Sequence, residues 1–294
     1  MEKIFIDLVS NAMGDTIACV PYVSEYQKIH NVDVTLSIND PYIFLMEESY
    51  PNIKFVGRKD VVSFDKKINL EYVFDKSVQG GYAEQLGFEN PIYIRPVVSI
   101  EEMNRPIKNK YVAMGVHSTS QLKYWNHESG LLGQSEAVNW NLLSAFLRKR
   151  GYTPVTVEQH ELFGSPPHFN GVPSKSNKQI GKSLWEATNI IKHAEFYIGL
   201  SSGMSWVAHA LGKRVVMIAN FSEDWNEFDT SLDDYIRVTN KSVCHGCWNK
   251  INIEYTFDKD DWYWCPKHKG TERQFECHTS ITVEDVIKEI EHWL

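Results

Sequence analysis

The chain has 294 residues, of which 43% are hydrophobic, 13% aromatic and 23% charged. This length and composition predict a sizeable buried core in about two domains, and they exclude disordered, collagen-like and coiled-coil chains. The formal net charge of −8 argues against nucleic-acid binding driven by bulk charge. No apolar run approaches the ~20 residues of a membrane-spanning helix, and the first ten residues do not resemble a signal peptide. We therefore expect a soluble, cytoplasmic protein.

The first hundred residues alternate short β-branched runs with helical patterns, which predicts an α/β unit with parallel strands. The expected strands cover residues 3–8, 33–38 and 53–56. The expected helices cover residues 14–31, 42–49 and 82–86. Two further apolar or extended segments cover residues 70–74 and 92–98. The polar segment 101–110 contains Pro106 and is the expected linker to a second unit.

A second series of strands and helices begins at residue 111, as in a doubly wound domain. Its expected strands cover residues 111–116, 154–157, 196–200 and 215–219. Its expected helices cover residues 140–150, 181–194 and 204–211, and a closing helix covers residues 283–294. Residues 165–177 are rich in Ser, Pro, Gly and Asn, which predicts a mobile loop that either covers a cleft or is a plain surface loop.

Four of the five cysteines lie within 34 residues: Cys244, Cys247, Cys265 and Cys277. Two thiolates separated by two residues can bind one ion from a tight turn, which Gly246 makes easy, and the other two complete a tetrahedral shell. The polar residues between them argue against four free core thiols. Four thiolates favour zinc or iron, and metal binding would help to order this irregular segment.

Other cysteine and histidine residues have simpler interpretations. Cys19 lies in an apolar helical stretch and is expected to be a small buried core residue. His245, His268 and His278 are spare candidates for metal ligation, but we expect them to be exposed loop histidines. Lys267, Lys269 and Arg273 form a small basic patch, which the acidic overall balance makes a weak argument for nucleic-acid binding.

Two segments follow expected strands of the second unit, at the sheet edge where doubly wound proteins bind ligands. Ser201, Ser202 and Gly203 precede a helix, where backbone N–H groups suit a phosphate, although a serine-rich helix cap is equally ordinary. The segment 117–126 carries Ser118, Thr119 and Lys123, whose hydroxyl and ammonium groups could meet phosphate oxygens. From spacing alone, Lys123 fits an exposed loop lysine equally well.

Asp15 opens the first expected helix, directly after the first strand. An aspartate in the first turn ordinarily caps the helix or interacts with its dipole. The functional alternative is a catalytic carboxylate that faces a cleft between the two units. Sequence chemistry alone favours the first interpretation.

Together, residues 14–16, 118–125 and 199–213 resemble the ADP-heptose:heptosyltransferase family of glycosyltransferases. The closest branch is the autotransporter strand-loop-strand O-heptosyltransferases, which modify serines of bacterial surface adhesins. The cysteine spacing resembles the four-cysteine iron finger of that branch, so the resemblance favours iron over zinc. The lipopolysaccharide branch often has Asp where Ser201 stands. The autotransporter branch usually carries a domain ahead of the first strand, which begins here at Lys3.

The resemblance implies an α/β fold of the GT-B type, in which two Rossmann-like domains face a cleft. The implied domains are an acceptor domain (1–107), a nucleotide-sugar domain (108–282) that includes the metal finger (240–280), and a C-terminal helix (283–294). It also implies a homo-oligomer that acts on a nucleotide-sugar donor and a protein acceptor, with no nucleic acid and no membrane span.

The resemblance also implies roles for single residues. Asp15 matches the general base of an inverting transfer, and Lys123 matches the lysine that pairs with the donor diphosphate. Glu158 follows the second strand of the nucleotide domain, where a carboxylate can hold ribose hydroxyls. The remaining donor-binding residues would be Ser118, Thr119, Ser201, Ser202 and Gly203. Alternatives are a transferase with another nucleotide sugar or a glycan acceptor, and a non-catalytic metal-finger protein that binds a nucleotide sugar or a partner.

Overall fold

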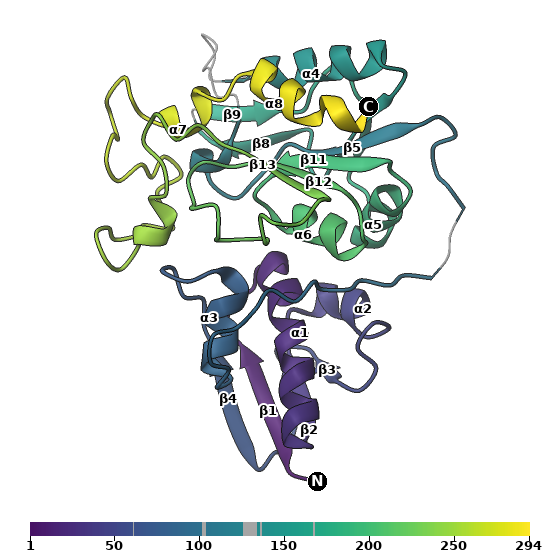
Figure 1. Ribbon diagram of the computed structural model, residues 1–294, viewed down its shortest axis with the longest axis vertical. Coiled ribbons are helices and arrows are strands. Elements are labelled where there is room, and N and C mark those ends of the chain that lie inside the picture. The colour runs from purple at the N-terminus through teal and green to yellow at the C-terminus, as the bar shows by residue number, and fades with distance from the viewer. Residues whose placement is uncertain (61, 102–103, 126–133, 136, 167) are drawn as a thin grey trace.

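The structure is a computed structural model that describes residues 1–60, 62–101, 104–125, 134–135, 137–166 and 168–294. It contains two α/β units, one built on strands β1 to β4 and the other on strands β5 to β13. Figure 1 shows the N-terminal unit below and the C-terminal unit above, with the cysteine-rich segment at one side of the C-terminal unit. The division into domains at residues 107 and 282 stays a prediction.

The N-terminal unit has a four-stranded parallel sheet in the order β3-β2-β1-β4. Its strands are β1 (Lys3–Leu8), β2 (Asp33–Ser37), β3 (Lys54–Val56) and β4 (Lys66–Leu70). Its helical elements are α1 (Met13–His30), η1 (Asp40–Tyr42), α2 (Ile43–Met46) and α3 (Val78–Gln85). Alternate side chains of β1 are buried (Ile4, Ile6 and Leu8), because successive residues of a strand point to opposite faces.

Helix α1 belongs to the N-terminal unit and contacts both units (Figure 1). It ends as expected at Asn31, which adopts a left-handed conformation (φ 51°) and donates its N–H to the carbonyl of Gln27. Residues 16–23 of α1 are all buried, including Cys19, because the helix packs on its own sheet and also against α6 (Gly203–Ala210) of the C-terminal unit. One apolar core therefore runs from the first sheet into the second unit.

The C-terminal unit has a six-stranded parallel sheet in the order β10-β7-β5-β11-β12-β13. Its strands are β5 (Tyr111–Gly115), β7 (Thr153–Glu158), β10 (Asn177–Ile180), β11 (Phe196–Leu200), β12 (Val215–Ile218) and β13 (Tyr235–Val238). Helices α5 (Leu184–Lys192) and α6 cover the face toward the N-terminal unit, and α4 (Val138–Lys149) and α8 (Val283–Ile290) cover the other face (Figure 1). The remaining short elements are η2 (Gln121–Lys123), η3 (Trp248–Lys250), α7 (Glu276–Thr279) and η4 (Glu291–Trp293).

The segment that joins the units is extended, as expected, and it docks on the C-terminal unit. Val98 donates its backbone N–H to the carbonyl of Ala210 at 3.0 Å, and Arg95 forms an ion pair with Asp234. Of the expected linker, residues 102–103 lie outside the described ranges.

Several sequence expectations are wrong in detail. The expected loop at 165–177 contains β9 (His168–Gly171), which pairs with β8 (Leu162–Ser165) and β6 (Gln134–Ser135) in a small third sheet. The helix expected at 181–194 is shorter, because a capping box of Ser183 and Glu186 starts it at Leu184. The helix expected at 42–49 covers only four residues after a 3₁₀ turn. Of the segment singled out at 70–74, only Leu70 belongs to a strand, because β4 ends there. Strand β13 was not expected.

The closing helix begins where it was expected. Thr282 accepts a hydrogen bond from the N–H of Asp285, and the Asp285 carboxylate accepts one from the N–H of Thr282. Within the described ranges, no helix is both long and apolar enough to span a bilayer.

Candidate active site and cysteine cluster

A cleft of ≈500 Å³ lies between the two units. It is lined by all eight residues that the sequence predicted for catalysis and donor binding: Asp15, Ser118, Thr119, Lys123, Glu158, Ser201, Ser202 and Gly203. Other lining residues were not expected from the sequence, among them Tyr72, Phe74, Asn226, Glu227 and Trp248. Asn126, the end of the lysine segment, lies outside the described residues.

Asp15 is the third residue of α1, and its carboxylate accepts a hydrogen bond from the hydroxyl of Ser10. The Ser10 oxygen accepts the N–H of Ala12 at 3.1 Å, so its proton is directed at the carboxylate. The N-cap position belongs to Ala12, and no side chain caps this helix. Burial raises the pKa of Asp15, although Ser10 and the charge of Lys123 oppose the shift. A carboxylate in this state is a better proton acceptor than an exposed aspartate.

Lys123 ends η2, and its ammonium group lies over two aromatic rings. The Nζ atom is 4.9 Å from the ring centroid of Phe221 and 5.0 Å from that of Trp248. Burial lowers the pKa of Lys123, and the charges of Glu227 and Asp15 oppose this shift. Among the described residues, none forms a hydrogen bond or an ion pair with the Nζ atom of Lys123. Its donors are therefore available to an anion in the cleft.

The turn between β11 and α6 presents helix N–H groups to the cleft. Ser202 is the N-cap of α6 and makes no side-chain capping bond. The Ser201 hydroxyl donates a hydrogen bond to Glu227 at 2.6 Å, which fixes the orientation of the Ser201 side chain. A Cβ atom at Gly203 would lie 2.7 Å from Met13 Cε and 2.9 Å from Met13 Cβ. In this structure the glycine allows close approach of α1.

Glu227 is the main cleft residue that the sequence did not reveal. Its carboxylate is 3% exposed and forms an ion pair with Arg237, which is equally buried. Burial alone would raise the pKa of Glu227, but Arg237, Ser201 and Lys123 together hold it below the usual value. The available signal was Arg237 itself, because a charged residue in the β-branched run 235–238 needs a buried partner.

Glu158 ends β7 and fixes the loop that follows β5. Its Oε1 accepts the backbone N–H groups of Val116 at 2.5 Å and His117 at 2.8 Å. Burial raises the pKa of Glu158 to about 7 despite these bonds. A second cavity of ≈320 Å³ adjoins the cleft at Glu158, Met13, Tyr42 and Met204, and is otherwise mostly apolar. The two cavities together offer a polar site with an apolar extension.

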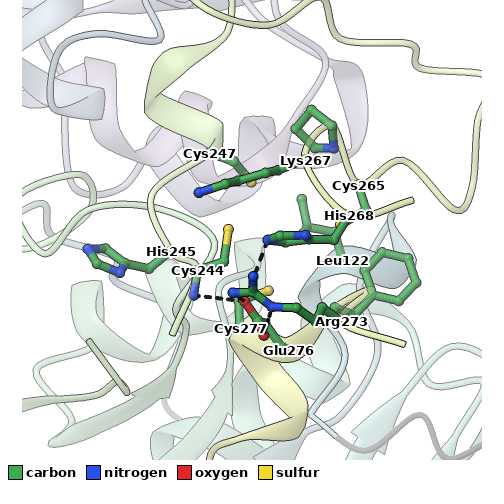
Figure 2. Close-up of a pocket in the computed structure, with 12 residues that line it drawn as sticks. Leu122, Cys244, His245, Cys247, Cys265, Lys267, His268, Arg273, Glu276 and Cys277 are labelled. Carbon is green, nitrogen blue, oxygen red and sulfur yellow. Dashed lines mark hydrogen bonds and ion pairs between the residues drawn. The ribbon is translucent and has the colours of Figure 1, made fainter. Parts of the chain in front are cut away.

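The four clustered cysteines line one small cavity of ≈10 Å³ (Figure 2): Cys244, Cys247, Cys265 and Cys277. Burial and the neighbouring cysteines raise the pKa of the Cys247 thiol to about 12 and also raise the pKa of Cys244 and Cys277. A cation would reverse this, because thiols that coordinate a metal lose their protons. All five cysteines of the chain are free thiols. Four thiols that line one cavity favour an ion that prefers thiolates, such as zinc or iron, although no three of their sulfur atoms lie within 4.8 Å of one another in this structure.

The histidines of this region differ from expectation. His268 is 9% exposed and His278 is fully buried, so neither is an exposed loop residue, whereas His245 is half-buried. The ligand atoms of Cys244, His268 and Glu276 lie within 4.8 Å of one another. Figure 2 shows Glu276 already engaged, since it accepts the N–H of Cys244 at 3.1 Å and pairs with Arg273 at 2.6 Å.

Comparison with known proteins gives a consistent result. No family model matches the chain. In sequence, the chain is similar to the autotransporter heptosyltransferase Aah of Escherichia coli, with 32% identity over 97% of this chain and 72% of the relative. It is also 28% identical to the inactive autotransporter heptosyltransferase BimC of Burkholderia thailandensis, over 98% of this chain and 68% of the relative.

In structure, the chain is similar to TibC of enterotoxigenic Escherichia coli, a dodecameric, iron-containing heptosyltransferase solved in complex with ADP-D-beta-D-heptose. The TM-score is 0.86 and the identity 28%, over 98% of this chain and 75% of TibC. The likeness therefore extends over both units and the cysteine-rich segment.

Proposed function

Because this chain belongs to the family of autotransporter heptosyltransferases, we propose that it transfers heptose from ADP-heptose to a serine hydroxyl of an autotransporter adhesin. The observation that carries the proposal is the cleft between the two units. It brings a carboxylate from one unit opposite a lysine and a helix N-terminus from the other. A carboxylate that takes a proton, facing groups that bind diphosphate, is the arrangement that an inverting glycosyl transfer needs.

Asp15 acts as the general base. Its carboxylate takes the proton of the acceptor hydroxyl while the hydroxyl oxygen forms a bond to the anomeric carbon of heptose. The bond from that carbon to the diphosphate oxygen breaks on the opposite face, so the configuration inverts and ADP leaves. The Ser10 hydrogen bond supports this role, because it orients the carboxylate without protonating it.

Lys123 and the α6 turn stabilise the charge that develops on the departing ADP. The ammonium group of Lys123 pairs with the diphosphate, and the N–H groups after Ser202 bind its oxygens at the positive end of the helix. Ser118 and Thr119 contribute hydroxyl groups from the loop after β5. Because the Ser201 hydroxyl donates to Glu227, Ser201 stabilises the shape of the turn in addition to lining the donor site.

Glu158 and the adjoining apolar cavity receive the nucleoside. One carboxylate oxygen is occupied by the loop after β5, which leaves the other for ribose hydroxyls. The base then fits the ≈320 Å³ cavity that begins beside Glu158. This placement puts the diphosphate between Glu158 and the α6 turn.

The four clustered cysteines hold an iron ion, with zinc as the alternative. The donor set supports this assignment, since the four thiols line one cavity and are costly to ionise without a cation. The bound ion would supply a structural cross-link for residues 240–280, which contain little regular secondary structure. No step of the transfer passes through it. Five free thiols fit the reducing cytoplasm, and we propose that the protein acts there as a homo-oligomer.

The test is mass spectrometry of a candidate autotransporter passenger after incubation with this protein and ADP-heptose, with Asp15→Asn in parallel. A heptose increment on serine that is lost in the variant would support donor, acceptor and base together. Because BimC is named as inactive, ADP-heptose binding is measured separately by calorimetry. Tight binding without transfer to any passenger would favour a non-catalytic binding protein, and absence of binding would overturn the donor.

A further inference from the structure

The cysteine segment (residues 240–280) reaches well beyond its own cavity. Trp248 directly follows Cys247, lines the cleft and lies 5.0 Å from the ammonium group of Lys123. We propose that Trp248 is a positioning residue for Lys123, so that the cysteine segment, and not only the nucleotide-binding sheet, sets where this ammonium group stands. The inference rests on the proposed function, in which Lys123 meets the diphosphate of the donor.

The side chain of Lys123 contacts this segment, and the short helix η2 that carries Lys123 is bound to it through Gln121. The backbone N–H of Gln121 in η2 donates to the carbonyl of Trp262 at 3.3 Å, and the Trp262 indole donates to the Gln121 side chain at 3.1 Å. Leu122, the residue between, lines the cysteine cavity, whereas Lys123 lines the cleft. The short helix η2 thus lies between the two sites.

The ring of Trp248 is itself fixed from three directions. Its indole N–H donates to the hydroxyl of Tyr72 in the N-terminal unit at 2.9 Å. Its backbone N–H donates to the carbonyl of Phe221 at 2.9 Å. Edge-to-face contacts join it to Phe74 at 5.4 Å and to Phe257 at 5.2 Å, where the distances separate ring centroids. A ring held in this way offers one fixed face to a cation.

The next residue extends the same contact to the N-terminal unit. The Asn249 amide donates to the carbonyl of Phe74 at 2.7 Å and to the side chain of Asn226 at 2.7 Å, and its oxygen accepts the N–H of Glu223 at 2.8 Å. Asn249 is 5% exposed, so these bonds are sheltered from water. Two adjacent residues of the cysteine segment therefore make different contacts: Trp248 contacts the ammonium group of Lys123, and Asn249 binds the loop after β4.

The test is a double-mutant cycle on ADP affinity, measured by calorimetry on the full chain with Trp248→Leu, Lys123→Met and both changes together. If Trp248 acts through Lys123, Trp248→Leu weakens ADP binding about tenfold in the unaltered chain, the loss expected for one cation–aromatic contact. The same change then costs less than about twofold in the Lys123→Met background. A merely structural role would give the same loss in both backgrounds, and that additivity would overturn the inference.

Matched variants separate this effect from loss of folding. Trp185→Leu removes a half-exposed tryptophan of α5 that lines neither cavity, and it is expected to leave ADP affinity unchanged. Metal content per chain, measured by elemental analysis, is expected to be equal in all variants. If Trp248→Leu does not fold, Trp248→Phe keeps a ring and is tested in the same cycle. If the unaltered protein does not bind ADP, the proposed donor is wrong and this inference is wrong with it.

Discussion

At the scale of single residues, Asp15 combines a raised pKa with a fixed orientation. Asp15→Asn keeps the size of the side chain and an oxygen for Ser10, but the amide cannot take a proton. We expect transfer to fall by about 10²–10⁴-fold, while the affinity for ADP changes by less than about threefold. Transfer and ADP binding are measured on the same preparation. A variant with near-normal turnover would remove Asp15 as the base.

The same carboxyl determines a pH dependence. Burial raises the pKa of Asp15, so kcat/KM is expected to fall with decreasing pH at a higher pH than an ordinary aspartate would give. The base is active only when ionised, so activity lies on the alkaline side of this pKa. A pH profile whose acid limb lay in the ordinary aspartate range would contradict the buried, ionised base.

Glu158 gives a prediction on stability. Its pKa is about 7 in the folded protein, against an ordinary value of 4.5. Between these values the folded state holds a proton that the unfolded state has released, so the free energy of unfolding falls as the pH rises. Glu158→Gln removes this dependence and retains an oxygen for the two N–H groups. We expect the variant to gain about 1–3 kcal/mol relative to the unaltered protein between pH 4.5 and 8.

Chemical denaturation at several pH values measures this difference. Glu48→Gln, on an exposed carboxyl of the N-terminal unit, is the control: it keeps Glu158, so its free energy of unfolding should follow that of the unaltered protein across the range. If the free energies of Glu158→Gln and the unaltered protein run parallel across the range, Glu158 is ionised normally in the folded state.

The sequence predicted which residues near the ends of strands line the cleft, because parallel strands end at one edge of a sheet and bring their loops together. This accounts for Asp15, Lys123, Glu158 and Ser202. Glu227 was missed, since it lies in an irregular segment and its only sequence signal, the charge of Arg237, lies in a strand that was not expected. An ion pair between two buried residues depends on the tertiary fold, and no periodic pattern in the sequence indicates it.

At the scale of elements, the cysteine segment has little regular structure of its own. Its order depends on long-range contacts and, in our proposal, on the bound ion. Cys244→Ser is expected to lower metal content from about one ion per chain to a small fraction, since three thiolates bind less tightly than four. Hydrogen exchange of residues 240–280 should then rise, because the segment loses its cross-link.

Cys19→Ala is the matched control, since Cys19 is a buried core residue of α1 remote from the cluster. It is expected to retain full metal content. Elemental analysis and hydrogen exchange on both variants decide the matter, and full metal content in Cys244→Ser would show that this thiol is not a ligand.

Elements with strong alternation were predicted well, and those whose pairing partners are distant were not. Strands β1 and β11 were expected with their observed bounds, because β1 alternates the buried Ile4, Ile6 and Leu8 with other residues and β11 is an apolar run. Strand β9 is rich in turn-forming residues and gains its structure from pairing with β8 and β6. Strand β13 carries a charge in its middle, which hid its apolar pattern.

At the scale of the whole molecule, the two units meet where α1 and α6 begin. A Cβ atom at Gly14 would lie 2.8 Å from Trp206 Cδ1, and one at Gly203 would lie 2.7–2.9 Å from Met13. Both helix N-termini consequently open on the cleft, where their N–H groups create a positive potential for a diphosphate. Sequence patterns predict each unit separately, but this close approach depends on two glycines whose partners lie some 190 residues apart in the chain.

The contact between the helices gives the last prediction. Gly203→Ala places a methyl group closer to Met13 than carbon atoms approach in proteins, so α1 and α6 must separate or Met13 must move. We expect a loss of about 1–3 kcal/mol in the free energy of unfolding and a lower rate of transfer, because Asp15 lies two residues from Met13 on the same helix. Met13→Ala in the same chain removes the obstructing Cε but keeps Cβ, so it should restore part of both. Chemical denaturation and transfer assays on the single and double variants provide the comparison. If Gly203→Ala alone matches the unaltered protein in both measurements, the spacing of the two units is not set at this contact.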